Sequence, residues 1–103
     1  MKIEEYDWYG YGPLEAADVE PENVAEIIHW YEGENDSENW MGVLRMKDGR
    51  WCYIESWCDY TGFDCQGGGE SFYASSESDL AYNCLTQEAR NAFGYDVPPD
   101  CGV

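Results

Sequence analysis

Five cysteines, one histidine and a large excess of carboxylates are the residues of this chain best suited to chemistry. Cys58 and Cys65 bracket the segment CDYTGFDC, with an aspartate after the first cysteine and another before the second. Structural zinc sites usually take cysteines in pairs separated by only a few residues, so that one tight turn brings both sulfurs to the ion. The cysteines here are more widely spaced: Cys52, Cys58, Cys65, Cys84 and Cys101. We therefore expect thiols without bound metal, although a turn that folds back also permits a disulfide between Cys58 and Cys65.

Catalysis by a thiol or by the histidine is not favoured either. No Lys or Arg lies between Cys58 and Cys65 to lower a thiol pKa, and the carboxylates of Asp59 and Asp64 raise it. His29 stands in an apolar segment, which is typical of a packed neutral ring rather than of a general base. We therefore expect no enzyme activity and no cofactor.

An alternative interpretation places chemistry around the glycine run at 67–69. This run lacks the lysine of a phosphate-binding loop, and nearby carboxylates repel phosphate unless a divalent cation intervenes. A small metal-dependent hydrolase is therefore the enzymatic alternative, with Asp59, Asp64, Cys65 and Glu70 as its candidate residues. The interpretation we favour is a structural turn in which Gly62 adopts a positive φ, while the side chains of Cys58, Phe63 and Cys65 point inward.

The charge of the chain is its most unusual property. It contains 22 Asp and Glu residues against 5 Lys and Arg, which gives a net charge of −17 over 103 residues. Such a charge warns of disorder, but aromatic residues make up 17% of the chain and supply apolar area for a core. We therefore expect one folded domain over residues 1–103 that keeps its carboxylates outside, either for solubility alone or as a binding surface.

The densest charge lies in residues 15–38, around a predicted helix at 21–32. Val24, Ile27, Ile28 and Tyr31 recur at helical spacing, and Pro21 suits the first helical position. This segment contains nine acids and no Lys or Arg. The acids that we predict to bind a partner are Glu15, Asp18, Glu20, Glu22, Glu26, Glu32, Glu34, Asp36 and Glu38.

The remaining elements predict a small antiparallel sheet. Asp48-Gly49 between two apolar runs indicates a hairpin of strands at about 40–46 and 50–58. We expect a two-residue turn, which pairs Met46 with Trp51; the alternative, a three-residue turn, shifts the pairing by one. A third strand is expected at 70–75, followed by two short helices and an irregular tail over 95–103. The N-cap candidates of the first helix are Ser76, Ser78 and Asp79, and the second helix is expected to begin after Thr86 and to end at Gly94. The fold class is α+β, with about three strands packed against an N-terminal helix and one or two C-terminal helices.

The region from 48 to 90 resembles a set of small acidic proteins without an assigned activity, many of them encoded by bacteriophages. They share a core similar to D-G-R-x-x-Y-x-E-x-x-C-D-Y-T-G-[FW]-D-C-Q. The matching positions here are Asp48, Gly49, Arg50, Tyr53, Glu55, 58–62, Asp64, Cys65 and Gln66. The resemblance implies a phage or prophage context and implies nothing about catalysis, and the acidic segment at 15–38 lies outside it.

These observations lead to one functional expectation and one alternative. We expect an acidic, non-enzymatic inhibitor that binds the basic nucleic-acid-binding surface of a host defence protein, as antirestriction and anti-CRISPR proteins do. Such a DNA mimic does not itself bind nucleic acid. A possible second site comprises Asp59, Tyr60, Phe63 and Asp64. The alternative is a partner-binding or structural phage protein whose acidity serves only solubility.

The start of the chain bears on its location. The segment MKIEEYDWYG has no apolar stretch of the kind that forms a signal peptide. No apolar run approaches the length of a membrane span. We therefore expect a cytoplasmic protein, in the host cytoplasm if it is phage-encoded, with no membrane association.

Overall fold

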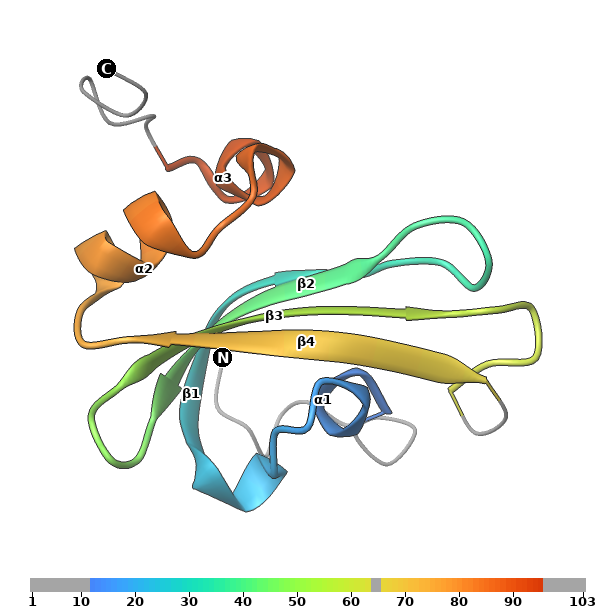
Figure 1. Ribbon diagram of the computed structural model, residues 1–103, viewed down its shortest axis with the longest axis horizontal. Helices are drawn as coiled ribbons and strands as arrows, with labels where there is room; N and C mark the ends of the chain where they lie inside the picture. The colour runs from blue at the N-terminus through green and yellow to red at the C-terminus, as the bar shows by residue number, and fades with distance from the viewer. Residues whose placement is uncertain (1–11, 64–65, 96–103) are drawn as a thin grey trace.

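A four-stranded antiparallel sheet forms the centre of the computed structural model, which describes residues 12–63 and 66–95. The strands are β1 (Val24–Tyr31), β2 (Trp40–Met46), β3 (Trp51–Cys58) and β4 (Gly67–Ala74), and they lie side by side in chain order. A short helix α1 (Gly12–Ala16) and a 3-10 turn η3 (Pro21–Asn23) precede the sheet, and α2 (Glu77–Asn83) and α3 (Gln87–Phe93) follow it (Figure 1). The expected α+β class is confirmed, with four strands rather than three.

The helix expected over residues 21–32 is wrong, because residues 24–31 form strand β1. The pairing of β1 with β2 is irregular twice, between Val24 and Glu26 and again between Ile27 and His29. Each irregularity adds a residue and resets the alternation of side chains between the two faces of the sheet. Val24 and Ile27 consequently pack in one core cluster although they are three residues apart. Two bulges in a strand therefore produced the spacing that predicted a helix.

The β2–β3 hairpin turns at Asp48-Gly49 as expected, but the two-residue register is wrong. The backbone N–H of Met46 donates to the carbonyl of Arg50 at 2.8 Å, which leaves three residues, Lys47, Asp48 and Gly49, in the loop. Gly49 closes this loop with a φ of 95°. The pairs are Arg45–Trp51, Leu44–Cys52 and Val43–Tyr53, as the three-residue alternative requires.

The predicted ends of the C-terminal helices are confirmed. The side chain of Ser76 accepts a hydrogen bond from the N–H of Asp79 and caps α2, and Thr86 caps α3 in the same way through Ala89. Gly94 ends α3 with a φ of 79°. Strand β4 begins at Gly67, earlier than predicted, and pairs with β3 along its whole length. Residues 96–103 of the predicted tail lie outside the described residues.

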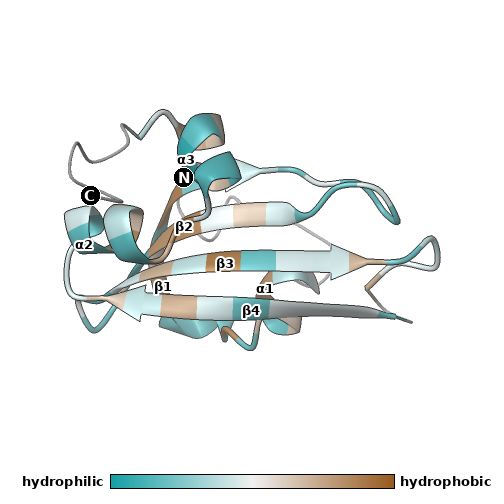
Figure 2. Cartoon of the chain, turned by 45° about the horizontal axis from the view of Figure 1, so that its top comes forward, coloured by the Kyte–Doolittle hydropathy of each residue, from teal (hydrophilic) through white to brown (hydrophobic). Residues whose placement is uncertain are grey.

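The sheet carries a hydrophobic cluster on each face. On the face covered by α1 the fully buried members include Leu14, Ile27, Leu44 and Ile54. On the other face Tyr53, Leu80 and Ala89 belong to a cluster that joins α2 and α3 to the central strands. Figure 1 shows that α2 and α3 lie over one end of this second face only. Figure 2 shows the remaining part of β3 and β4 side by side with no helix in front of it.

Candidate partner-binding surface

Strand β1 divides the predicted acidic segment into two separate parts, residues 15–22 before the strand and residues 32–39 after it. Residues 15–22 belong to α1 and the connection after it, beneath the sheet in Figure 1. Glu26 lies within β1 and forms an ion pair with Arg45 at 3.1 Å, so its charge is locally compensated. Residues 32–39 form the loop between β1 and β2 at the far end of the sheet. The nine predicted residues therefore do not form one helical surface.

The loop at 32–39 is joined to the end of strand β3. The backbone N–H of Asp36 donates to the carbonyl of Cys58 at 2.7 Å, and the thiol of Cys58 donates to Oδ1 of Asn35 at 3.2 Å. These contacts place the loop beside the β3–β4 loop at 59–66, and neither segment contains a Lys or an Arg. We call the carboxylates that these loops bring together the acidic loop end: Glu32, Glu34, Asp36, Glu38 and Asp59.

Neighbouring donors hold several of these carboxylates in place. Glu32 accepts a hydrogen bond from the indole N–H of Trp30 at 3.1 Å. Glu38 accepts one from the hydroxyl of Tyr31 at 3.0 Å, and this bond to a carboxylate raises the pKa of Tyr31. The backbone N–H of Glu34 donates to the carbonyl of Glu38 at 3.0 Å and closes the loop on itself. The loop therefore presents ordered carboxylates rather than a diffuse acidic tail.

The possible second site at 59–64 has a structural and an exposed part. Asp59 accepts hydrogen bonds from both the backbone N–H and the hydroxyl of Thr61, and Gly62 completes the turn with a φ of 89°. The ring of Phe63 packs edge-on against Trp40, with ring centroids 4.8 Å apart. Tyr60 is 80% exposed, whereas Asp64 and Cys65 lie outside the described residues.

The inward orientation predicted for Cys58 and Phe63 is confirmed, because Cys58 is buried and Phe63 is half-buried against Trp40. The prediction that residues 58–63 form a structural turn is therefore confirmed. Among the described residues of the predicted second site, Tyr60 is exposed, whereas Asp59 and Phe63 are half-buried.

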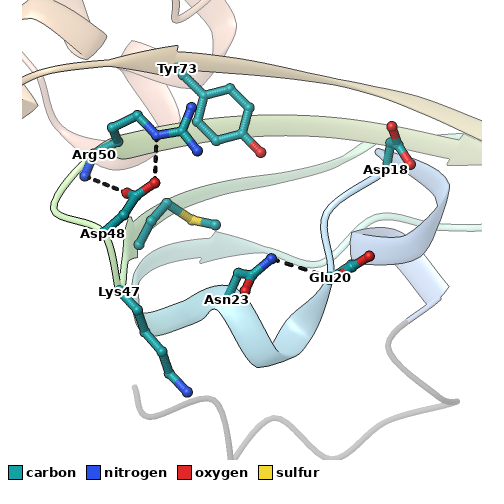
Figure 3. Close-up of a pocket in the computed structure, with 8 residues that line it drawn as sticks. Asp18, Glu20, Asn23, Lys47, Asp48, Arg50 and Tyr73 are labelled. Atoms are coloured by element: carbon teal, nitrogen blue, oxygen red, sulfur yellow. Dashed lines mark hydrogen bonds and ion pairs between the residues drawn. The ribbon is translucent and has the colours of Figure 1, made fainter.

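The acids on the α1 side lie in a region of mixed charge. Asp18 and Glu20 line a cavity of about 600 Å³ together with Lys47 and Arg50 of the β2–β3 hairpin (Figure 3). Arg50 pairs with Asp48 at 2.8 Å, also in this cavity. The exposed side chains of Glu15 and Glu22 flank the same connection. This part of the predicted surface therefore includes cations, whereas the acidic loop end does not.

Three of the four cationic side chains among the described residues are engaged away from the acidic loop end, and the fourth, Lys47, lies in the β2–β3 hairpin loop. Arg45 pairs with Glu26 in the sheet, and Arg50 pairs with Asp48 at the opposite end of β3. Arg90 in α3 donates to the backbone carbonyls of Ala81 and Leu85 at 3.0 and 3.1 Å. Among the described residues, the five carboxylates of the acidic loop end therefore have no ion pair, and these three arginines lie elsewhere in the fold.

Reasoning from the sequence missed a further pair of carboxylates. Glu55 of β3 and Glu70 of β4 are direct partners in the register of these strands. Trp57 follows two residues after Glu55 and is 44% exposed. The alternation of side chains along each strand indicated which residues share a face. The register of β3 with β4, which brings Glu55 opposite Glu70, was not predicted. Because side chains alternate along a strand, these residues lie on the same face as Tyr53, which is the face that carries α2 and α3.

The thiols and the histidine have packing roles where the structure describes them. Cys52, Cys58 and Cys84 are free, and burial raises the pKa of Cys52 to about 12. Burial and then the carboxylate of Asp59 raise the pKa of Cys58. His29 stacks on Phe93 with ring centroids 5.2 Å apart. Within residues 12–63 and 66–95, no group of three or more His, Cys, Asp and Glu side chains is arranged to hold a metal ion.

Comparisons with known proteins found no match to this chain among protein-family models, curated proteins or solved structures. In the part of the chain that the structure describes, no helix has the length and apolar character needed to cross a membrane.

Proposed function

We propose that this protein is an acidic, non-enzymatic inhibitor that binds a basic nucleic-acid-binding surface of another protein. The observation that carries the proposal is the acidic loop end, where two adjacent loops without Lys or Arg gather five carboxylates. A net charge of −17 gives this surface a long-range field in addition to its local contacts.

Nucleic-acid-binding proteins present grooves of Lys and Arg that match the phosphate charges of the backbone, about one per 1.7 Å of duplex axis. A compact set of carboxylates held by hydrogen bonds satisfies such a groove without the flexibility of an acidic tail. Electrostatic attraction steers the two surfaces together and weakens as salt screens the charges. The inhibitor therefore occupies the site that a nucleic acid otherwise uses.

The non-enzymatic part of the proposal is supported by the chemistry of the candidate nucleophiles and bases. A catalytic thiol needs a lowered pKa, whereas burial raises the pKa values of Cys52, Cys58 and Cys84. The ring of His29 stacks on Phe93 and lies edge-on to Tyr95, which gives it a packing role. Oδ1 of Asp59, a candidate in the hydrolase alternative, accepts hydrogen bonds from the backbone N–H and the hydroxyl of Thr61.

The target class follows from the resemblance to phage proteins. A phage-encoded inhibitor of a nucleic-acid-binding protein acts in the host cytoplasm on a defence nuclease or surveillance complex. The region of resemblance contains the β3–β4 loop, which contributes Asp59 to the acidic loop end. The proposal thus assigns recognition to this end of the sheet and a structural role to the DYTG turn.

Capture of proteins from a bacterial lysate by two charge-matched variants tests the proposal. The first variant neutralises the four acids of the β1–β2 loop (Glu32→Gln, Glu34→Gln, Asp36→Asn and Glu38→Gln). The second makes the same four changes on the α1 side (Glu15→Gln, Asp18→Asn, Glu20→Gln and Glu22→Gln). Both variants have the same net charge, and the amide groups preserve side-chain size.

We expect the first variant to lose a nucleic-acid-binding partner that the unchanged protein captures, and the second to lose far less of it. Equal capture by all three proteins would favour the alternative, a phage protein whose acidity serves only solubility. Equal loss in both variants would show that net charge rather than the acidic loop end governs binding.

A further inference from the structure

The sheet face that carries α2 and α3 is open at the end nearest the β3–β4 loop. Leu80 and Ala89 cover Tyr53 at the other end of this face. Phe72, the cross-strand partner of Tyr53, is 38% exposed, and nearer the loop Trp57 is 44% exposed. We call this area the open β3–β4 surface, and its residues are Glu55, Trp57, Gly68, Glu70 and Phe72.

Side chains on this surface form three cross-strand rows. The register pairs Tyr53 with Phe72, then Glu55 with Glu70, then Trp57 with Gly68. Successive rows on one face lie about 7 Å apart. A pair of carboxylates therefore lies between aromatic side chains on both sides, and directly opposed like charges destabilise a sheet unless a cation compensates them.

Neighbouring side chains fix the position of Glu55 without supplying a positive charge. Its two carboxylate oxygens accept hydrogen bonds from Asn39 at 2.7 Å and from the hydroxyl of Tyr53 at 3.2 Å. Both ion pairs among the described residues, Arg45–Glu26 and Arg50–Asp48, involve other carboxylates. The open β3–β4 surface is thus an aromatic surface with an uncompensated acidic row.

Gly68 allows the indole ring of Trp57 to lie close to the backbone of β4. A Cβ atom at position 68 would lie 3.2 to 3.4 Å from three atoms of that ring, a contact that the glycine avoids. The ring therefore lies across the row next to Glu55 and Glu70, while 44% of the residue remains accessible to a partner. A planar cation stacked on this ring is within reach of the carboxylate row.

We propose that the open β3–β4 surface receives an arginine side chain of the cationic partner, stacked on Trp57 and paired with Glu55 and Glu70. This inference rests on the proposed function, because that function supplies the cationic partner. Guanidinium groups stack on aromatic rings and donate two parallel hydrogen bonds to carboxylates, which a lysine ammonium does not do. A second copy of the chain is disfavoured as the occupant, because each copy carries a charge of −17.

An arginine that stacks on an aromatic ring and pairs with a carboxylate is already present on the opposite face of the sheet. The guanidinium carbon of Arg50 lies 4.2 Å from the centroid of the Tyr73 ring, and its Nε donates to Asp48 at 2.8 Å (Figure 3). An aromatic ring and a carboxylate thus already hold one arginine within this fold. The open β3–β4 surface offers an equivalent ring and two carboxylates to an arginine from outside.

Calorimetric titration with two peptides, one of eight arginines and the other of eight lysines, tests the inference. We expect the arginine peptide to bind about threefold more tightly, as an exposed cation–π contact predicts. Trp57→Leu should abolish this preference, whereas Tyr82→Leu should retain it, because Tyr82 is equally exposed at 44% but lies on α2. Glu70→Gln should weaken binding of the arginine peptide more than Glu88→Gln, an exposed acid on α3.

Equal affinity for the two peptides would overturn the inference, as would a preference that survives Trp57→Leu or no binding of either peptide. Thermal unfolding of each variant verifies that it is folded. The β1–β2 loop variant separates the two proposals. Equal peptide affinities combined with loss of partner capture by that variant would refute arginine recognition and leave the proposed function intact.

Discussion

The backbone N–H of Asp36 donates to the carbonyl of Cys58 at 2.7 Å, and this contact joins the β1–β2 loop to the end of strand β3. Asp36 adopts a φ of 59°, a left-handed conformation that aspartate tolerates better than most residues. The loop is thereby held where its carboxylates lie beside Asp59. The acidic loop end is consequently a product of the fold and not of charge density along the sequence alone.

The turn that supports this end should be sensitive to its glycine. Gly62 has a φ of 89°, and its N–H donates to the carbonyl of Asp59 at 3.0 Å. Gly62→Ala should lower the free energy of unfolding by about 1 to 2 kcal/mol, measured by urea denaturation. Gly62→Asn should lower it less, because asparagine tolerates positive φ. Equal stability of all three proteins would contradict this account of the turn.

A buried hydroxyl should hold helix α1 on the sheet. Ser56 is fully buried, and its hydroxyl donates to the carbonyl of Pro13 at 2.6 Å. Ser56→Ala leaves that carbonyl without this donor and should lower the free energy of unfolding by about 1 to 2 kcal/mol. Ser78→Ala, at an exposed position of α2, serves as the control and should change stability by less than about 0.5 kcal/mol.

Stability should fall at alkaline pH, in part through Cys52. Burial raises the pKa of this thiol from 9.0 to about 12. A group with a raised folded-state pKa contributes stability fully below its unfolded pKa and loses it as pH rises through the folded value. Urea denaturation between pH 8 and pH 11 should therefore show a decline, and Cys52→Ala should make the decline shallower. Burial also raises the pKa of Tyr53 and Tyr95, so the Cys52→Ala variant should still lose part of its stability at alkaline pH.

The opposed carboxylates of β3 and β4 should reduce stability when no partner is bound. Glu55 and Glu70 face each other across the strands, and like charges in such pairs are destabilising. Glu70→Gln should therefore raise the free energy of unfolding by a few tenths of a kcal/mol at low salt, and the gain should shrink as salt is added. A loss of stability in this variant would show that Glu70 is compensated by another group.

The sequence predicted the fold where local signals and tertiary structure agree. The turn at Asp48-Gly49, the cap at Thr86 and the stop at Gly94 each depend on a few neighbouring residues and were located correctly. The cap of α2 is Ser76, one of three predicted candidates. Strand β1 was predicted as a helix because its two bulges depend on pairing with β2. The hairpin register was one residue off because the sequence does not distinguish a two-residue from a three-residue turn.

The candidate surface was predictable in composition but not in shape. The acids at 32–38 are evident in the sequence, whereas their separation from those at 15–22 follows from strand β1. The opposition of Glu55 and Glu70 depends on the register of β4, whose first three residues are glycines with low strand propensity. The shape of the candidate surface therefore depends on long-range strand pairing, which local sequence patterns do not specify.

Competition with duplex DNA for the captured partner tests the central claim most directly. The complex between this protein and that partner is titrated with DNA, and the bound fraction is followed by fluorescence anisotropy of the labelled protein. We predict that DNA releases the protein from a single shared site and that the affinity of the complex falls steeply with salt. A ternary complex of partner, DNA and this protein, with an affinity insensitive to salt, would contradict the account.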